Sequence, residues 1–206
     1  MVADDVELLE AWAEGDDQAG VELFQRHYSS VFRFFNGKGV RDVEDLVQET
    51  FMGLAKGRDA YRGEGSFRGY VFGTARNVLR QHLRRVQRKE GKIDFGTASV
   101  ADLVDSPSQV LADRAERRLL LEGLRRLAID DQIVIELFLW ESMTAIEIGQ
   151  VLGLGEPAVR SRLHRAKGRL GDVLASIASS PEILQSTMSD LESWSKRVRE
   201  VAGARG

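Results

Sequence analysis

The stretch that decides the fold is Thr144-Ala-Ile-Glu-Ile-Gly-Gln-Val-Leu152, followed by Gly153-Leu-Gly155 and Glu156-Pro-Ala-Val-Arg-Ser-Arg-Leu-His-Arg-Ala-Lys-Gly-Arg-Leu170. Apolar residues recur at helical spacing on both sides of the glycines, which predicts two helices that each bury one face. The glycines predict a tight turn, and Pro157 suits the start of a helix because its φ angle is already helical. Together these features predict a helix-turn-helix between Thr144 and Leu170.

The second helix of this motif has one apolar face and one basic face. Its buried residues should be Val159, Leu163, Ala166 and Leu170. An ordinary solvated helix pair could also contain a glycine turn. Here, however, the turn occurs together with a small residue where the two helices cross, an apolar face and a basic face. This combination favours DNA binding. The N-terminal half of such a helix meets base edges, and its flanks meet phosphates. We predict base contacts from Arg160, Ser161, His164 and Arg165, and phosphate contacts from Arg162, Lys167 and Arg169.

The composition is that of a soluble globular protein. Of the 206 residues, 43% are hydrophobic and 30% are charged, and no apolar run approaches the roughly 20 residues that span a bilayer. The acidic N-terminus does not look like a signal peptide, so we expect a cytoplasmic protein. There is no cysteine and the 3 histidines are scattered, which argues against a disulfide framework or a metal site. We expect no metal, no cofactor and no enzymatic activity.

The net charge of −3 conceals a strong segregation of charge along the chain. Acidic residues dominate before Lys56, whereas Glu90 is the only acid in the range Arg76–Lys92. A second basic cluster occupies the range Arg160–Arg169. Segregation of this kind indicates local nucleic-acid surfaces on a protein that also binds something else.

Helical spacing of apolar residues continues through nearly the whole chain and predicts an all-α fold. The periodicity is lost between about Arg88 and Gln109, where Ser106-Pro107-Ser108 and several glycines indicate a flexible linker. Ser180-Pro181 marks a last helix, whose apolar stripe would be Leu184, Met188, Leu191, Trp194 and Val198. We predict two small helical domains, residues 1–88 and 112–175, with a linker at 89–111 and a C-terminal helical extension at 176–206.

The predicted helix from Asp42 to Met52 carries a row of acids opposite its apolar stripe. A solvated acidic face would be the ordinary explanation. However, Met52 lies in the middle of this face, and an apolar centre ringed by acids is typical of a docking surface for a basic partner. This acidic face consists of Asp42, Glu44, Asp45, Gln48, Glu49 and Met52.

The long helix after the glycine-rich loop has the opposite charge. Arg76, Arg80 and Arg84 recur every four residues and form an arginine stripe, in which like charges repel at short range. A polyanion would relieve that repulsion, although a core loop with exposed arginines is the plainer alternative. Amide groups lie beside the stripe, and the preceding loop has groups suited to clamping unpaired bases. The candidate DNA contacts here are Tyr61, Arg62, Ser66, Phe67, Arg76, Asn77, Arg80, Gln81 and Arg84.

Several stretches together resemble the extracytoplasmic-function class of bacterial RNA polymerase sigma factors. They are Asp42-Val-Glu-Asp-Leu-Val-Gln-Glu-Thr-Phe51, Tyr61-Arg-Gly-Glu-Gly-Ser-Phe-Arg-Gly-Tyr70, Ala75-Arg-Asn-Val-Leu79 and Val159-Arg-Ser-Arg-Leu-His-Arg-Ala166. They occur in the family's order, and the resemblance covers the range from about Leu8 to Leu174. The two domains would then be sigma region 2, a helical bundle, and sigma region 4, which holds the helix-turn-helix.

The resemblance implies a partner for each surface. The acidic face would bind the clamp helices of the β′ subunit of core RNA polymerase, and the β flap would be a second polymerase contact. The arginine stripe and the loop before it would contact and help to melt the minus-ten promoter element. The helix after Gly155 would read the minus-thirty-five element, and the resemblance adds Glu156 to the base contacts named above. An anti-sigma factor or other regulatory protein is a further expected partner.

Two matters stay open at this point. The segment after Ser176 exceeds typical members of the family, and it could form a lid or partner surface, stabilise the fold, or support oligomerisation. The rivals to a sigma factor are a helix-turn-helix regulator that never enters polymerase and a helical interaction protein that binds no promoter. The regulator would leave the acidic face and the arginine stripe without a joint purpose.

Overall fold

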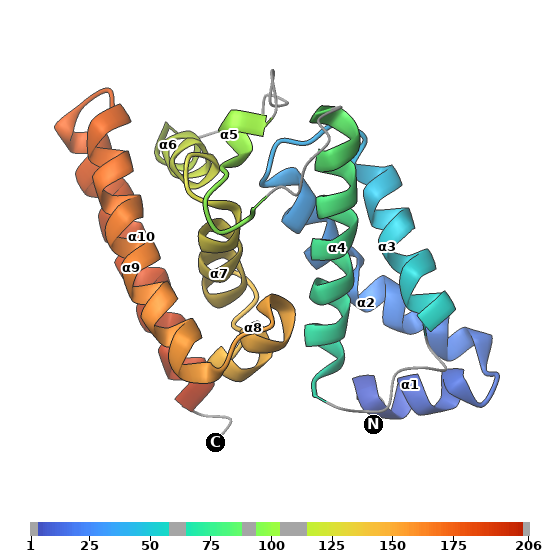
Figure 1. The fold of residues 1–206 in the computed structure, drawn as a ribbon. Coiled ribbons are helices and arrows are strands. Elements are labelled where there is room, and N and C mark those ends of the chain that lie inside the picture. The colour runs from blue at the N-terminus through green and yellow to red at the C-terminus, as the bar shows by residue number, and fades with distance from the viewer. Residues whose placement is uncertain (1–3, 58–64, 88–93, 104–114, 204–206) are drawn as a thin grey trace.

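The computed structural model describes residues 4–57, 65–87, 94–103 and 115–203. The regular structure of these residues is helical, apart from an isolated bridge between Ser99 and Ala128, which confirms the predicted all-α fold. No described helix is long and apolar enough to cross a membrane. In chain order the helices in Figure 1 are α1 (Asp5–Ala13), α2 (Asp17–Asn36), α3 (Val43–Gly57), α4 (Phe67–Gln87), α5 (Val100–Leu103), α6 (Ala115–Arg125), α7 (Ile129–Leu139), α8 (Ala145–Leu152), α9 (Glu156–Ile177) and α10 (Pro181–Gly203).

Helices α1 to α4 form the first half of the molecule around an apolar core. The largest side chains at its centre, Phe35, Phe72 and Leu79, are at most 1% exposed. Helix α2 ends at Asn36, and Gly39 follows with a φ of +65°, a left-handed conformation that glycine adopts without strain. Helices α3 and α4 pack side by side, so the two oppositely charged helices belong to one bundle.

Helices α8 and α9 form the predicted helix-turn-helix. Thr144 caps α8 by accepting a hydrogen bond from the Glu147 amide, and Gly153 ends α8 in the left-handed conformation. The turn lies close against α8 at Gly149, where a Cβ would lie only 2.4 Å from the Leu154 carbonyl oxygen, so a residue without a side chain is needed there. Ile148 is the isoleucine that enters the core, whereas Ile146 is 60% exposed.

Helix α10 is the predicted C-terminal extension, and it packs on α6, α7 and α9 (Figure 1). The Ser180 hydroxyl accepts a hydrogen bond from the Ile183 amide, as expected of a capping serine. Leu191 and Thr187 are buried on its inner face, and Met188 is partly buried there. The side chains of Trp194 and Val198 lie outside the described residues. The extension therefore completes the helical bundle of the second half.

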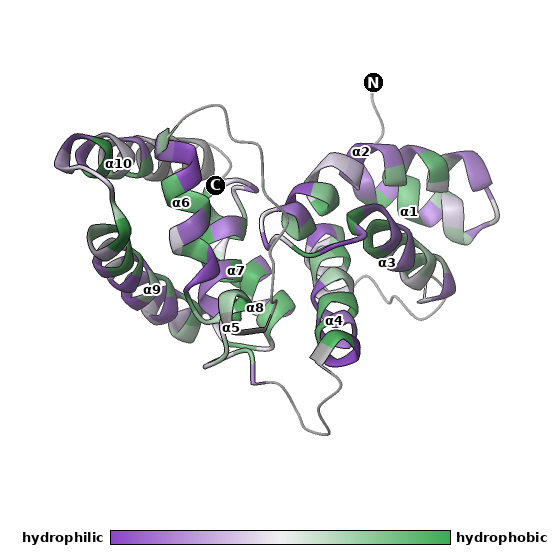
Figure 2. Ribbon diagram, turned by 90° about the horizontal axis from the view of Figure 1, so that it is seen from above, coloured by the Kyte–Doolittle hydropathy of each residue, from purple (hydrophilic) through white to green (hydrophobic). Residues whose placement is uncertain are grey.

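Part of the predicted linker is packed against the second half. The Asp130 amide donates to the Phe95 carbonyl at 2.9 Å, and the Ile129 amide donates to the Ala98 carbonyl at 2.9 Å. Phe95 itself is 2% exposed. The sequence showed no helical period here because this segment is held by a turn, backbone hydrogen bonds and one aromatic anchor. Apolar residues face inward in both halves (Figure 2), and α4 lies along α8 where the halves meet.

Candidate nucleic-acid interface

Helix α9 presents its predicted base-contacting residues to solvent. Ser161, His164 and Arg165 are exposed and make no hydrogen bond or ion pair with other described residues. Arg160 is also exposed, and it pairs with Glu156 one turn earlier at 2.5 Å. Val159, Ala166 and Leu170 are 0% exposed on the opposite face. The apolar face therefore anchors the helix, and the face predicted to read bases is open.

The arginines on the flanks of α9 are engaged within the protein. Arg162 Nη1 lies 3.3 Å from Asp130 Oδ2, and its Nε lies 3.2 Å from Asp131 Oδ1. Arg169 Nη2 lies 2.5 Å from Asp131 Oδ2. Lys167 Nζ lies 4.5 Å from the centre of the Phe138 ring, a cation–π contact. The predicted phosphate contacts are thus held by acids and an aromatic ring of α7.

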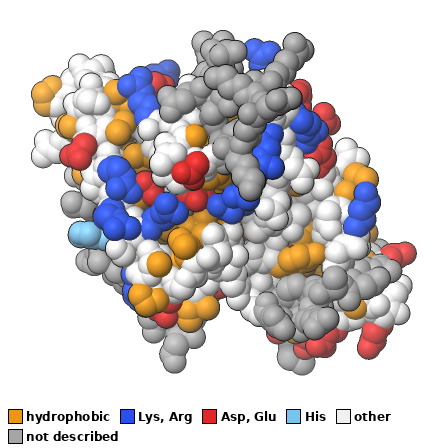
Figure 3. Space-filling model, in the orientation of Figure 1, with side chains coloured by type: hydrophobic (Ala, Val, Ile, Leu, Met, Phe, Trp, Pro, Cys, Tyr) orange, Lys and Arg blue, Asp and Glu red, His pale blue; other side chains and the backbone are white. Residues whose placement is uncertain are grey.

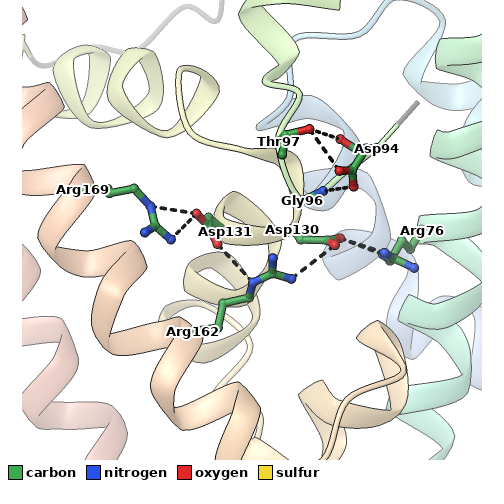
Figure 4. A network of polar contacts seen from close by, with 8 residues as sticks. All are labelled: Arg76, Asp94, Gly96, Thr97, Asp130, Asp131, Arg162 and Arg169. Atoms are coloured by element: carbon green, nitrogen blue, oxygen red, sulfur yellow. Dashed lines mark hydrogen bonds and ion pairs between the residues drawn. The ribbon is translucent and has the colours of Figure 1, made fainter. Parts of the chain in front are cut away.

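One arginine of α4 belongs to the same network (Figure 4). Arg76 Nη2 donates to Asp130 Oδ1 at 2.8 Å, and its Nε donates to the same oxygen at 3.0 Å. Asp130 therefore lies between an arginine of the first half and Arg162 of the second. The network alternates in charge from Arg76 through Asp130, Arg162 and Asp131 to Arg169. We refer to it as the aspartate network.

The other residues of the arginine stripe differ from one another in their exposure and contacts. The Arg80 guanidinium lies 5.1 Å from the centre of the Phe95 ring. Burial, and next the charge of Arg76, lowers the pKa of Arg80. The effect of Arg76 is the repulsion between neighbouring arginines that their four-residue spacing predicts. Arg84 is exposed, as are Asn77 and Gln81 beside it. The stripe thus passes from a covered end near Arg76 to an open end at Arg84.

The predicted minus-ten contacts that precede the arginine stripe have a different status. Phe67 is 4% exposed and packs edge-on against His27 at 5.4 Å, so its ring belongs to the core and is not free to stack on a base in this structure. That part of the prediction is corrected, since an aromatic residue at the first position of an amphipathic helix fits a core equally well. Tyr61 and Arg62 lie outside the described residues. Ser66 is half-buried, and its hydroxyl accepts a hydrogen bond from the Gly69 amide.

The acidic face of α3 lies on the surface. Met52 is 49% exposed. Glu49 is half-buried and pairs with Arg85 of α4 at 2.9 Å. The other members are exposed and make no side-chain hydrogen bond or ion pair with described residues: Asp42, Glu44, Asp45 and Gln48. The face is therefore a preformed acidic surface with an apolar side chain on it.

A buried ion pair joins the two halves behind these surfaces. Lys38 Nζ, which is 0% exposed, lies 2.5 Å from Glu136 Oε2 of α7. Gln132 donates to Glu136 Oε1 at 2.8 Å, and Arg125 Nε donates to the Gly37 carbonyl at 3.1 Å. Burial lowers the pKa of Lys38 and raises the pKa of Glu136, and their mutual attraction opposes both shifts. The contact between the halves is thus polar at its centre.

Several residues of this contact were missed from the sequence. Glu141 pairs with Arg33 at 2.9 Å and with Arg68 at 3.6 Å, both from the first half. Gln150 of α8 accepts a hydrogen bond from the Ser66 amide at 3.2 Å. Asp130 and Asp131 read as ordinary acids in the first turn of a helix, where the helix dipole favours them. No pattern within one helix reveals a partner on another.

The surface of the molecule also shows opposite charges close together. In Figure 3, basic side chains gather around acidic ones where the halves meet. A cavity of about 620 Å³ opens beside the aspartate network, with walls that include Arg126, Arg165 and Thr97. Among the described residues there is no cluster of His, Asp and Glu that could hold a metal ion.

Comparisons with known proteins agree with the division of the chain into two halves. Family models match residues 21–89 (Sigma-70 region 2) and residues 117–170 (Sigma-70, region 4). The chain is 30% identical to the RNA polymerase sigma factor NccH of Alcaligenes xylosoxydans xylosoxydans over 170 residues, which are 80% of this chain and 91% of NccH. It is 25% identical to the ECF RNA polymerase sigma factor SigM of Mycobacterium tuberculosis, over 82% of this chain and 84% of SigM. The fold resembles that of CnrH, solved in complex with the cytosolic domain of CnrY, with a TM-score of 0.62, 24% identity, and coverage of 85% of this chain and 99% of CnrH.

Proposed function

The chain belongs to the extracytoplasmic-function sigma factors, non-catalytic subunits that direct RNA polymerase to promoters, and we propose how its surfaces divide that work. The acidic face of α3 binds core polymerase. The arginine stripe of α4 binds the minus-ten element, and helix α9 binds the minus-thirty-five element. The observation that carries the proposal is that an open acidic face on α3 and a basic stripe on α4 lie on two helices packed together within one bundle.

Binding of core polymerase follows from the chemistry of the acidic face. Its exposed carboxylates have no partner to give up among the described residues, so a basic helical surface such as the β′ clamp helices can pair with them at little cost. Met52 provides an apolar contact at the centre, where water is excluded. The β flap is the second polymerase contact, through region 4.

Promoter recognition uses two different modes of binding. Arg160, Ser161, His164 and Arg165 are exposed on α9, where they can reach base edges in the major groove of duplex DNA. Arg80, Arg84 and the adjacent amides can bind the phosphates of an opened strand. The protein contributes binding energy that holds the strand apart.

A charge reversal on α3 tests the polymerase contact. The variant Asp45→Lys/Gln48→Lys changes two exposed side chains that make no hydrogen bond or ion pair with any residue the structure describes. We expect its affinity for core polymerase to fall about 100-fold, because like charges then face the basic partner. The matched control, Glu10→Lys/Gln25→Lys, changes exposed residues of α1 and α2 and should bind normally. Equal affinity of both variants would exclude the acidic face as the docking surface, and a helix-turn-helix regulator acting outside polymerase would then be the better interpretation.

A regulatory protein is the remaining proposed partner. CnrH, which shares the fold, was solved with the cytosolic domain of CnrY bound to it. We extend this to the present chain: an anti-sigma factor that covers the acidic face or the basic surfaces would block polymerase or promoter binding. Copurification of the chain from its native cells, followed by identification of bound proteins, tests this partner.

A further inference from the structure

We propose that α10 is a displaceable lid: it occupies an apolar groove of α6, α7 and α9 in the free chain, and core polymerase binds in this groove once α10 has left it. The inference rests on the proposed function, since it takes region 4 as the second polymerase contact. It goes beyond that function because it locates the contact on region 4 and makes the C-terminal extension its competitor.

Helix α10 lies outside the part of the chain that the relatives share. The region 4 family model ends at residue 170, before α10 begins at Pro181. The structural match takes up 99% of CnrH but 85% of this chain, so this chain has residues without a counterpart in CnrH. Helix α10 is therefore an addition to region 4, and its role has to be sought in this chain.

The inner face of α10 has the spacing of a helix that docks in a groove. Its buried and partly buried side chains include those at positions i, i+3, i+4 and i+7 of one stripe: Leu184, Thr187, Met188 and Leu191. Amphipathic helices that bind in a groove of another protein place their anchors at the same four positions. The groove beneath α10 therefore accepts an amphipathic helix.

The contact between α10 and this groove is apolar. The side chains from residue 181 to residue 191 make no hydrogen bond or ion pair with α6, α7 or α9. Even the buried Thr187 hydroxyl donates within α10, to the Ile183 carbonyl at 2.7 Å. A helix that leaves such a contact strands no buried charge or polar group behind it. Another apolar helix can therefore replace α10 without breaking a polar interaction.

Helix α10 also leaves part of the groove uncovered. A cleft of about 340 Å³ opens between α6 and the turn from α9 to α10, and its walls include Leu119, Ile177 and Ile183. Leu184 and Met188 are only partly buried. Apolar surface that stays partly in water contributes less to docking than fully buried surface. The free energy that holds α10 in the groove is thus smaller than a closer fit would give.

The position of the groove favours core polymerase as the second occupant. In Figures 1 and 2, α10 lies beside α6 and α9, on the side away from helices α1 to α4. The exposed residues Ser161, His164 and Arg165 of α9 are proposed to bind DNA, and α8 lies along α4. The groove is used by neither. We therefore assign it to a polymerase helix with apolar residues at the spacing of the α10 stripe.

The first test releases α10 and measures the affinity for core polymerase. Met188→Glu/Leu191→Glu places two carboxylates on the inner face, where their burial is costly, so α10 should leave the groove. The control, Gln185→Glu/Ser189→Glu, adds the same charge at exposed positions of α10. We expect the release variant to bind about tenfold more tightly than the control, because a larger fraction of the free chain is open. Equal or weaker binding would mean that α10 only stabilises the fold, and would overturn the proposal.

A second variant tightens the contact and should act in the opposite direction. Thr187→Val replaces a buried hydroxyl with a methyl group of similar size, so the stripe becomes wholly apolar. The affinity for core polymerase should fall about threefold, because the open fraction becomes smaller. Hydrogen exchange of α10 amides should slow in this variant and accelerate in the release variant, while thermal unfolding followed by circular dichroism verifies that both are folded. An affinity equal to or above that of the parent chain would contradict the competition.

A peptide tests the groove directly. The probe has the sequence of Pro181–Gly203 and is added to the release variant, whose own α10 no longer covers the groove. It should bind this variant and lower its affinity for core polymerase to that of the control chain. The same peptide with Met188→Glu/Leu191→Glu should do neither. A parent peptide that does not compete with polymerase would exclude the groove as the shared site.

The outcomes distinguish this inference from the proposed function. If neither the parent chain nor any α10 variant binds core polymerase, the proposed function fails, while binding of the peptide to the release variant still reports on the groove. If the parent chain binds and charge reversal on α3 weakens that binding, but the α10 variants all bind like the parent, the lid fails alone.

Discussion

Helices α3 and α4 pack against each other and carry opposite charges, yet their charged surfaces have different surroundings. The acidic face of α3 is mostly exposed, and its exposed members make no ion pair with the described residues, whereas Arg76 and Arg80 at one end of the α4 stripe are covered by Asp130 and Phe95. The acidic surface is therefore open in this structure, whereas one end of the basic surface is occupied by groups of the same chain.

The largest effect should come from the buried pair that holds the halves together. Lys38→Met leaves the Glu136 carboxylate buried without its partner, which costs about 3–5 kcal/mol. The contact between the two halves should lose most of its stability, and the covered end of the arginine stripe should become more accessible. Hydrogen exchange of α7 amides, together with denaturant unfolding, measures both consequences.

A second substitution distinguishes charge from packing at this position. In Lys38→Met/Glu136→Leu both partners become apolar, and replacement of a complete buried pair is often close to neutral. We therefore expect the double variant to recover much of the stability lost by Lys38→Met. A single variant as stable as the parent would mean that the buried pair does not hold the halves together.

The next prediction compares an exposed arginine of α9 with an arginine of the same helix that is ion-paired to α7. Arg160→Ala should weaken binding of the holoenzyme to its promoter by about 1–3 kcal/mol, if Arg160 contacts a guanine with both nitrogens. It should leave the free chain's stability nearly unchanged, because its exposed pair with Glu156 contributes little.

Arg162→Ala should behave in the opposite way. This side chain is 22% exposed and pairs with both Asp130 and Asp131, so its loss should destabilise the free chain and change promoter selectivity less. Promoter selection from a random library, with denaturant unfolding in parallel, separates the two effects. Equal losses of selectivity for the two variants would contradict the assignment of Arg160 to bases and Arg162 to phosphates.

The sequence predicted what is local and periodic. The helix-turn-helix, its glycine turn and the acidic face follow from spacing within one or two adjacent helices, and the structure has them. The resemblance to sigma factors was also available, because its motifs are short and contiguous. Ser180 and Pro181 marked the start of α10 for the same reason.

The contact between the halves could not be predicted in this way. Lys38 and Glu136 are 98 positions apart, and neither breaks the pattern of its own segment. Phe67 fits the apolar stripe of α4 and also fits a base-stacking site, so only packing against His27 decides its place. Phe95 lies in a segment without helical period, where nothing marks it as an anchor. Long-range partners require the fold.

The smallest effect concerns His82, which lies between the two charged surfaces. Burial, and next the charge of Arg85, lowers the pKa of His82 below its ordinary value of 6.5, while Asp42 and Glu49 oppose the shift. The folded protein thus favours neutral His82. The contribution of neutral His82 to the free energy of unfolding is fully present above pH 6.5 and is lost as the pH falls below that value. The variant His82→Gln should lose less stability than the parent chain between pH 7 and about 5. Denaturant unfolding across this range measures the difference, and parallel pH profiles would show that the acids of α3 compensate fully for the arginines of α4 at this position.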